Sequence, residues 1–405
     1  MNQLEWIFSD EAELMLEKIR QWENIGKSTL QILKLLRKEF VPETSSQLME
    51  LTELRKRGLQ KFQRAGQMFF SRKQLEQATS EIVSQYKAQR FAEKNSVVDL
   101  CCGIGGDALA LANPQRDLSI VDSDELTLKM ASHNLRVHGH EAIAHLGTAE
   151  GVDVKKYDAF HIDPDRRPNQ NHSQKAGRTV TAENFSPSLD ILREFEKSNP
   201  NFGIKLAPAS EIWTGDYEIE FIGHLRECKQ QMVWSGDLIR TRGRTATVIA
   251  HQGNAHESFS FDNVHTAHAS LATSLKKYVY DPHSALLASG LTEAFATQYS
   301  LESLGEPSSY LTSDKKIQSL LASCFEVVAS LPAQLKVIEK FLQQQEIGKL
   351  EVKKRGALDT VHRQLNKLNL KGHKSLTIIL SDTPFGYQAI ACKRFQSLET
   401  EPPNA

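Results

Sequence analysis

The stretch SVVDLCCGIGGDALALA, residues 96–112, constrains the fold of this chain more than any other segment. Its first residues are mostly β-branched and apolar, which predicts a buried strand. The glycine cluster predicts a tight turn, and the alanine- and leucine-rich end predicts the start of a helix. A strand, a glycine turn and a helix in this order are typical of nucleotide-binding folds, in which backbone N–H groups approach the ligand.

Two nucleotide-binding patterns fit this glycine turn, and the residues before it separate them. Gly103, Gly105 and Ala108 satisfy the GxGxxA pattern of dinucleotide-binding folds. In those folds the apolar strand usually runs directly into the first glycine, whereas here an acid, Asp99, lies four residues before Gly103. The pattern D-x-x-C-G-x-G-G instead resembles the first motif of class I S-adenosylmethionine (SAM)-dependent methyltransferases. We therefore favour SAM over a nicotinamide dinucleotide as the cofactor.

The resemblance also implies where SAM would bind. The glycines would let the backbone approach its amino-acid end, which an acid at the position of Asp99 supports directly or through water. Asp122 ends the next predicted strand, and a carboxylate there offers two oxygens to the two ribose hydroxyls. The family usually places its adenine-contacting loop at the segment HLGTAEG. The alternative is that Asp99 and Asp122 are merely solvated acids in loops. The glycine turn and the spacing of the two acids favour cofactor binding instead. The expected cofactor-binding residues are Asp99, Cys101, Gly103, Gly105, Gly106, Asp107, Asp122, Ser123, Thr148, Ala149 and Glu150.

A second motif, HIDPDRRP at residues 161–168, ends the fourth predicted strand of this region. Its acid–proline pair occupies the position of the D/N-P-P-Y motif of methyltransferases that act on amino groups. A rigid proline fixes the turn, and the carboxylate accepts hydrogen bonds from a target amine, so that the nitrogen lone pair points at the methyl group. The predicted catalytic residues are Asp163, Pro164 and Arg166, and the residues expected around the substrate are Arg167, Lys175, Arg178 and Lys205.

Arg166 departs from that motif, because the usual residue at its position is an aromatic that stacks on a flat base. An arginine can still stack on a base or bind a phosphate, and the alternative is a structural salt bridge with Asp165 or Glu150. The D-P-x-R pattern is also similar to that of uracil-C5 RNA methyltransferases, which need a cysteine nucleophile after a later strand. The segment NFGIKLAPASEIW has no cysteine, so we disfavour methylation of carbon.

Hydrophobic periodicity divides the chain into four predicted domains. Apolar residues at helical spacing predict an N-terminal helical domain over residues 1–92. Alternating strands and helices predict an α/β domain with a mostly parallel, Rossmann-like sheet over residues 93–255. A more weakly patterned connecting segment follows over residues 256–328, and residues 329–398 predict a small α+β domain of two helices and three strands.

Segments spread over nearly the whole chain resemble a bacterial family of class I SAM-dependent methyltransferases with a THUMP-like C-terminal domain. They include DLCCGIGGD, HIDPDRRP, MVWSGDL, YVYDPHSALLASGL and LEVKKRGALDTVHRQL. The resemblance implies a ferredoxin-like part over 256–328 and a THUMP-like domain over 329–398. THUMP domains bind RNA, often tRNA, so the resemblance implies methyl transfer to a base nitrogen of a structured RNA, a tRNA or an rRNA. Further residues expected to bind that RNA are Lys353, Lys354 and Arg355.

The overall composition limits the alternatives without removing them. With 49 Lys and Arg against 50 Asp and Glu, the chain is no polycation, so any RNA-binding surface must be a local patch. Five cysteines without CxxC spacing, no recognisable leader and no long apolar run predict a cytoplasmic protein without a metal site or a membrane span. A non-catalytic SAM- or RNA-binding protein, and a methyltransferase acting on a protein or a small molecule, remain alternatives.

Overall fold

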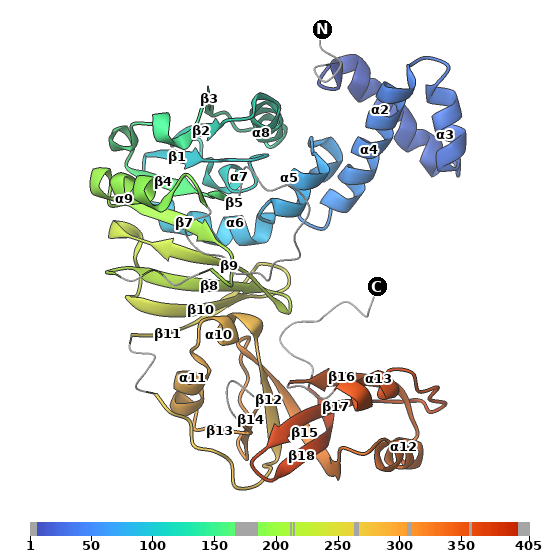
Figure 1. Ribbon diagram of the computed structural model, residues 1–405. Helices are drawn as coiled ribbons and strands as arrows, with labels where there is room; N and C mark the ends of the chain where they lie inside the picture. Colours follow the sequence, from blue (N-terminus) through green and yellow to red (C-terminus); the bar gives the residue numbers. More distant parts are fainter. Residues whose placement is uncertain are drawn as a thin grey trace. The chain divides into compact units, whose positions relative to one another are not determined.

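A computed structural model describes residues 6–166, 185–210, 213, 215–262, 267–305, 310–355 and 359–395 of the chain (Figure 1). The chain forms two compact units, Met1–Ser173 with Glu183–Ile204 and Gln174–Ala182 with Lys205–Ala405. The four domains expected from the sequence divide the chain more finely, and their boundaries stay a prediction. No helix within the ranges just given is long and apolar enough to cross a membrane.

The first unit begins with helices, as the apolar spacing predicts. Ser9 caps the first of them by accepting a hydrogen bond from the backbone N–H of Ala12, and Ser28 forms a capping box with Gln31 at the second. Pro42 is the first residue of the third, where its missing N–H would have no intrahelical acceptor in any case. The elements are α2 (Asp10–Asn24), α3 (Thr29–Leu36), α4 (Pro42–Gly58), η1 (Ala65–Gln67), α5 (Arg72–Gln77), α6 (Glu81–Ala88) and η2 (Gln89–Phe91).

A parallel sheet follows these helices, with its strands in the order β3-β2-β1-β4-β7. The central strand is buried, since Val97, Val98 and Leu100 have no exposed area. Because the carboxyl ends of parallel strands share one edge of a sheet, the segments after β1, β2 and β4 meet there. This arrangement confirms the predicted Rossmann-like sheet. The strands are β1 (Ser96–Leu100), β2 (Asp117–Asp122), β3 (Ile143–Leu146), β4 (Ala159–Ile162) and β7 (Phe202–Leu206).

Short helices and turns connect the strands of this sheet. Asp124 caps α8 by accepting a hydrogen bond from the backbone N–H of Thr127. Residues 165–166 and 185–186 pair as a two-stranded antiparallel ribbon. The connecting elements are α7 (Ala108–Leu111), α8 (Glu125–Val137), η3 (Ala149–Gly151), η4 (Val154–Lys156), β5 (Asp165–Arg166), β6 (Phe185–Ser186) and α9 (Leu189–Ser198).

One buried amide joins the N-terminal helices to the glycine turn. Asn134 in α8 has no exposed area. Its Oδ1 accepts a hydrogen bond from the backbone N–H of Phe69 (2.8 Å), and its Nδ2 donates to the carbonyl oxygens of Phe69 (3.1 Å) and Ile104 (3.0 Å). Ile104 lies inside the glycine turn, so one side chain holds both this turn and the segment before α5. The N-terminal helices accordingly belong to the same compact unit as the parallel sheet.

The second unit contains two sets of strands. The strands of the first set are ordered β9-β8-β10-β11, and β8 pairs antiparallel with β9 and parallel with β10. The second set is a seven-stranded sheet with the order β13-β14-β12-β15-β18-β17-β16. The elements of the first set are β8 (Glu218–His224), β9 (Glu227–Trp234), η6 (Gly236–Leu238), β10 (Gly243–Ile249) and β11 (His256–Phe261).

The seven-stranded sheet has a separate apolar core on each face. Ile378 and Ile379 are neighbours in β17 and point to opposite faces. Ile378 packs with Ile338 of α12 and Leu365 of α13, whereas Ile379 packs with Phe325 and with residues of the preceding strands. The elements are β12 (Tyr278–Pro282), α10 (Ser284–Ala288), α11 (Thr292–Gln298), β13 (Glu302–Ser303), β14 (Leu311–Ser313), β15 (Ala322–Pro332), α12 (Leu335–Gln344), β16 (Ile347–Lys354), α13 (Asp359–Leu365), β17 (Lys374–Thr383) and β18 (Gly386–Arg394).

Replacing Asn134 by leucine tests whether its side chain joins the N-terminal helices to the glycine turn. Leucine has a similar volume but leaves three buried backbone groups without their hydrogen-bond partner. We expect the free energy of unfolding of the first unit to fall by about 2–4 kcal/mol, measured by urea unfolding of the full chain. The control is Ser132→Ala in the same helix, where the hydroxyl donates only to the carbonyl of Leu128; it should change the value by less than about 0.5 kcal/mol. Equal midpoints for both variants would contradict the role of Asn134.

Candidate functional site

The glycine turn connects β1 to α7 and has a backbone that few other residues adopt. Gly103 and Gly105 have φ angles of 56° and 83°, in the left-handed region that glycine tolerates. A Cβ atom at Gly106 would lie 3.0 Å from the carbonyl oxygen of Thr79. Cys101 has a φ of 57° although it carries a side chain, so the turn holds local strain. The turn is thus packed directly against the segment that precedes α6.

Asp122, at the carboxyl end of β2, is half-buried and hydrogen-bonded to the glycine turn. Its Oδ2 accepts a hydrogen bond from the backbone N–H of Gly103 (3.0 Å), and its Oδ1 accepts one from the N–H of Asp124 (3.0 Å). The position predicted for the ribose hydroxyls is therefore next to the turn, and the contact itself stays a prediction.

Carboxylates from four places in the sequence gather around Cys101. Burial raises the pKa of its thiol, and the carboxylates of Asp122, Asp163, Asp99 and Glu150 raise it further. The acids lie at or near the carboxyl ends of β1, β2 and β4 and in the segment after β3, so the parallel strand order brings them together. Their negative field suits a cationic ligand. A thiol with such a raised pKa is a poor nucleophile.

Asp99 belongs to a buried network of charged side chains. Its Oδ1 accepts a hydrogen bond from Nδ1 of His161 (2.7 Å). The other ring nitrogen of His161 lies 3.4 Å from Nζ of Lys87, which forms a 2.6 Å ion pair with Asp107. Asp107 also accepts a hydrogen bond from the hydroxyl of Thr79 (2.7 Å). Burial raises the pKa of Asp99, and the interaction with His161 opposes this increase.

His161 and Lys87 were not among the residues predicted from the sequence. His161 lies inside the apolar strand sequence AFHI, where nothing local indicates a role. The parallel pairing of β1 with β4 places Asp99 opposite His161, and this register could have identified the histidine had the strand order been known. Lys87 lies in an amphipathic helix, and its burial depends on packing that the sequence pattern does not encode.

The other expected cofactor residues lie along the same edge of the sheet. Ser123 is exposed directly after β2, Thr148 and Glu150 are exposed in the segment after β3, and Ala149 between them is buried. Asp107 is buried in the network just described. The fold therefore brings all the expected cofactor-binding residues to one region, and their individual contacts with a cofactor stay predictions.

The predicted catalytic pair lies at the end of β4. The backbone N–H of Asp163 donates to the carbonyl of Leu100 at the end of β1 (3.3 Å), and this bond holds the motif beside the glycine turn. Asp163 is half-buried and Pro164 is buried. Arg166 pairs through its backbone with Phe185 in the β5–β6 ribbon.

The residues expected around the substrate are only partly placed by the structure. Lys205 is half-buried in β7, and Lys354 is exposed near the end of β16. Arg167, Lys175 and Arg178 lie outside the described residues.

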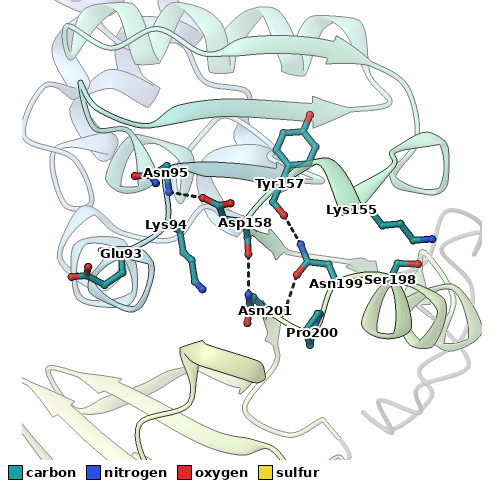
Figure 2. A pocket seen from close by; sticks show the side chains of 10 residues that line it. All are labelled: Glu93, Lys94, Asn95, Lys155, Tyr157, Asp158, Ser198, Asn199, Pro200 and Asn201. Carbon is teal, nitrogen blue, oxygen red and sulfur yellow. Dashed lines mark hydrogen bonds between the residues drawn. The ribbon is translucent and has the colours of Figure 1, made fainter.

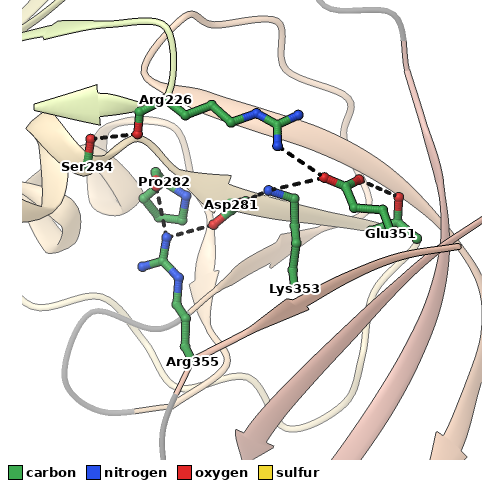
Figure 3. A network of polar contacts seen from close by, with 8 residues as sticks. Arg226, Asp281, Pro282, Ser284, Glu351, Lys353 and Arg355 are labelled. Carbon is green, nitrogen blue, oxygen red and sulfur yellow. Dashed lines mark hydrogen bonds and ion pairs between the residues drawn. The ribbon is translucent and has the colours of Figure 1, made fainter. Parts of the chain in front are cut away.

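Lys353 and Arg355, two of the residues expected to bind RNA, are held in a network of ion pairs (Figure 3). Asp281 in β12 forms ion pairs with Lys353 (2.8 Å) and Arg355 (2.6 Å), and all three side chains are largely buried. Glu351 lies 3.8 Å from Lys353 and 3.5 Å from Arg226. The two cations therefore join β16 to β12, and their charges are largely compensated within the second unit.

A pocket lined by polar side chains lies at the opposite edge of the parallel sheet from the glycine turn (Figure 2). It encloses about 510 Å³ beside the segments that lead into β1, β4 and β7. Asp158 accepts hydrogen bonds from the backbone N–H groups of Asn95 (2.8 Å) and Ser96 (3.1 Å), and Asn199 donates to two carbonyl oxygens. These groups tie the connecting segments together. The pocket is therefore separate from the cofactor site.

Two protein families match parts of this chain. The family described as methyltransferase small domain matches residues 62–184, and the family described as THUMP domain-like matches residues 322–394. The first match contains the glycine turn and the HIDPDRRP motif, together with the segment before α5 that Asn134 holds. The second contains β15 to β18 with α12 and α13. Both agree with the resemblance noted in the sequence.

Similar proteins cover most of the chain. Two uncharacterised S-adenosylmethionine-dependent methyltransferases from two strains of Mycobacterium tuberculosis are each 26% identical over 355 residues, which is 82% of this chain and 92% of each relative. The crystal structure of a protein from Porphyromonas gingivalis W83, provisionally described as a methyltransferase, has a TM-score of 0.75 at 20% identity. It covers 96% of this chain and 100% of its own. This structure shows that the fold is shared over the part of this chain that it covers.

The residues at the glycine turn fit SAM. Oδ2 of Asp99 is a buried acceptor without a hydrogen-bond partner in the described part of the chain, and the amino-acid end of SAM carries an ammonium donor. The carboxylates around Cys101 suit the positive charge of a sulfonium. Asp122 offers acceptor oxygens at the end of β2. Together with the matched families, this donor and acceptor set assigns SAM as the cofactor.

Replacing Asp99 by asparagine separates stability from binding. Burial raises the pKa of Asp99 above its unfolded value, so the native state binds more protons and stability falls as the pH rises through that range. Removing the charge should therefore raise the melting temperature of the ligand-free protein by about 1–3 °C. SAM affinity should fall about tenfold or more, because the amide offers no charge to the ammonium.

Thermal unfolding and calorimetry measure these two effects. Asp117→Asn, at an exposed position at the start of β2, is the control and should change neither. An Asp99→Asn variant that binds SAM as the wild type does would contradict the assigned contact.

Replacing Asp281 by alanine leaves Lys353 and Arg355 without their shared carboxylate. We expect the free energy of unfolding of the second unit to fall by about 3–5 kcal/mol, the usual effect of breaking a buried ion pair. In the control Glu326→Ala, the carboxylate contact with Lys277 is 4.0 Å long and exposed, so the change should be below about 1 kcal/mol. Urea unfolding followed by circular dichroism distinguishes the two. Equal effects would show that the network does not hold β16 to β12.

Proposed function

We propose that this chain, a SAM-dependent methyltransferase with a THUMP-like C-terminal domain, methylates a base nitrogen of a structured RNA. The RNA is a tRNA or an rRNA. The observation that carries the proposal is the combination of the two domains in one chain. One domain has a site that fits SAM, and the other is similar to a domain type that binds RNA.

The charge of the THUMP-like segment supports an RNA partner. Residues 322–394 contain twelve Lys and Arg against six Asp and Glu, although the whole chain is close to neutral. A local excess of cations attracts the phosphates of a nucleic acid. Lys353 and Arg355 order β16 through Asp281, and Lys354 lies exposed between them. The exposed cations of the segment are Lys336, Lys340, Lys349, Lys354, Arg363, Lys367, Lys371, Lys374 and Lys393.

Asp163 and Pro164 are proposed to position the target nitrogen. When bound, SAM supplies an electrophilic methyl group on a positively charged sulfur. The Asp163 carboxylate accepts a hydrogen bond from the N–H of the target base, which orients the nitrogen lone pair and increases its electron density. The same carboxylate can take the proton that the nitrogen loses. Pro164 restricts the backbone that carries this carboxylate.

Nitrogen is a better target than a pyrimidine carbon for this site. Methylation of a pyrimidine carbon uses a thiolate to activate the ring, and the cysteines of the first unit are Cys101 and Cys102. Burial and neighbouring carboxylates raise the pKa of both, so neither provides a thiolate near neutral pH. A nitrogen with its own lone pair needs no covalent intermediate.

The remaining substrate contacts are part of the same proposal. Arg166, next to the catalytic pair, stacks on the target base or binds a phosphate. Lys205 and the cations beyond Arg166 contact the RNA backbone, where Lys and Arg are the usual partners of phosphate. These cations are Arg167, Lys175 and Arg178. Residues 1–92, 93–255, 256–328 and 329–398 are the proposed domains of the enzyme.

Replacing Asp163 by alanine tests the proposed centre. The full chain is incubated with SAM labelled in its methyl group and with total RNA from a strain that lacks the gene. We expect the wild type to label RNA and Asp163→Ala to reduce the rate about a hundredfold or more, with the dissociation constant for SAM unchanged within about threefold. Asp153→Asn, which removes an exposed carboxylate before η4, is the control and should label RNA at the wild-type rate.

Each other result of this experiment contradicts part of the proposal. Label in proteins or metabolites but not in RNA would exclude an RNA substrate. SAM binding without any transfer would favour a non-catalytic binding protein. Full activity of Asp163→Ala would exclude Asp163 from the reaction centre.

A further inference from the structure

The acid in the SAM motif is held by a side chain from the neighbouring strand. Asp99 and His161 stand opposite each other in the parallel pair β1–β4. Nδ1 of His161 lies 2.7 Å from Oδ1 of Asp99, and the two side chains are 2% and 1% exposed. At this distance and burial the contact is a strong, charge-assisted hydrogen bond that fixes the plane of the carboxylate.

Lys87 determines which nitrogen of His161 carries the proton. An ammonium group has only donors, so a hydrogen bond from Nζ of Lys87 to Nε2 of the imidazole, 3.4 Å away, assigns the acceptor role to Nε2. The proton of a neutral imidazole then resides on Nδ1 and points at Asp99. Asp107 holds Lys87 in place through a 2.6 Å ion pair. Donors and acceptors therefore alternate from Asp107 through Lys87 and His161 to Asp99.

This alternation leaves one acceptor open. The hydrogen bond from His161 occupies Oδ1 of Asp99, whereas Oδ2 is buried and has no hydrogen-bond partner among the residues that the structure covers. A buried carboxylate oxygen without a donor is unfavourable. A ligand that brings a cationic donor to this oxygen would complete the site.

We propose that His161, held by Lys87, is a positioning residue for cofactor binding: it orients Asp99 so that Oδ2 receives the ammonium group of the amino-acid end of SAM. His161 itself touches neither the cofactor nor the substrate. Its hydrogen bond stabilises the ionised form of Asp99 against the effect of burial and prevents the carboxylate from rotating. The inference concerns the cofactor alone, so it does not depend on the proposed RNA substrate.

Two amide substitutions of His161 test this role as a matched pair. In His161→Asn the side-chain Nδ2 lies close to the position of the original Nδ1 and can still donate to Asp99. In His161→Gln the amide reaches towards Lys87 and leaves Asp99 without this donor. The probes are S-adenosylhomocysteine, which has the amino-acid end, and 5′-methylthioadenosine, which lacks it. Calorimetry on the full chain gives a dissociation constant for each.

We expect His161→Gln to weaken the binding of S-adenosylhomocysteine about tenfold or more and that of 5′-methylthioadenosine less than about threefold. His161→Asn should bind both within about threefold of the wild type. His373→Phe, at an exposed histidine of the second unit, is the control and should bind both as the wild type does. His161→Phe, which keeps the ring volume without a donor, should behave as His161→Gln does.

The ratio of the two affinities separates positioning from a general structural effect. A variant that disturbs the fold weakens both probes equally, and equal weakening in His161→Gln and His161→Phe would overturn the proposal. Unchanged binding of S-adenosylhomocysteine in both would overturn it as well. Equal losses for the Asn and Gln variants would show that the donor at the Nδ1 position is not what Asp99 requires.

Discussion

The parallel pairing of β1 with β4 is the contact on which the candidate site depends most. In this register Asp99 stands opposite His161, and Leu100 accepts the backbone hydrogen bond of Asp163. The cofactor motif and the acid–proline motif are more than fifty residues apart in the sequence, and this one pairing brings them together. A shift of the register by a single residue would turn Asp99 to the other face of the sheet. The geometry of the candidate site therefore depends on the backbone hydrogen bonds between β1 and β4 as well as on the side chains themselves.

The burial of the Asp99 carboxylate opposes the stability of the ligand-free protein. Burial raises the pKa of Asp99, and four carboxylates act on the thiol of Cys101. Such an arrangement persists because the surrounding fold holds it and a cationic ligand relieves it. The C-terminal sheet, in contrast, compensates its buried carboxylate with cationic side chains of the protein itself. There the negative charge of Asp281 is neutralised by ion pairs with Lys353 and Arg355, so this network needs no ligand.

Local sequence patterns predicted those parts of the site whose structure is determined by neighbouring residues in the sequence. The strand–turn–helix of residues 96–112 has its cause within the segment, because left-handed backbone angles at Gly103 and Gly105 require glycine. The parallel sheet follows from alternating strands and helices. The partners of Asp99 lie far away in the sequence, in β4 and α6, so no local pattern identifies them. Lys353 and Arg355 are a similar case. The sequence shows that they are cations, but no local pattern predicts that both form ion pairs with Asp281, more than seventy residues earlier.

The hydrogen bonds of Asn134 with Phe69 and with the glycine turn also affect how the chain folds during synthesis. The backbone groups of Phe69 receive their hydrogen bonds from Asn134, 65 residues further on. The ribosome delivers the N-terminal helices first, and β1, β2 and α8 must follow before this amide is in place. Until then the backbone groups of Phe69 lack this partner, although Arg55 in α4 can already donate to the carbonyl oxygen of Met68. The backbone N–H of Phe69 in the nascent chain therefore gains its native hydrogen bond only when α8 has left the exit tunnel.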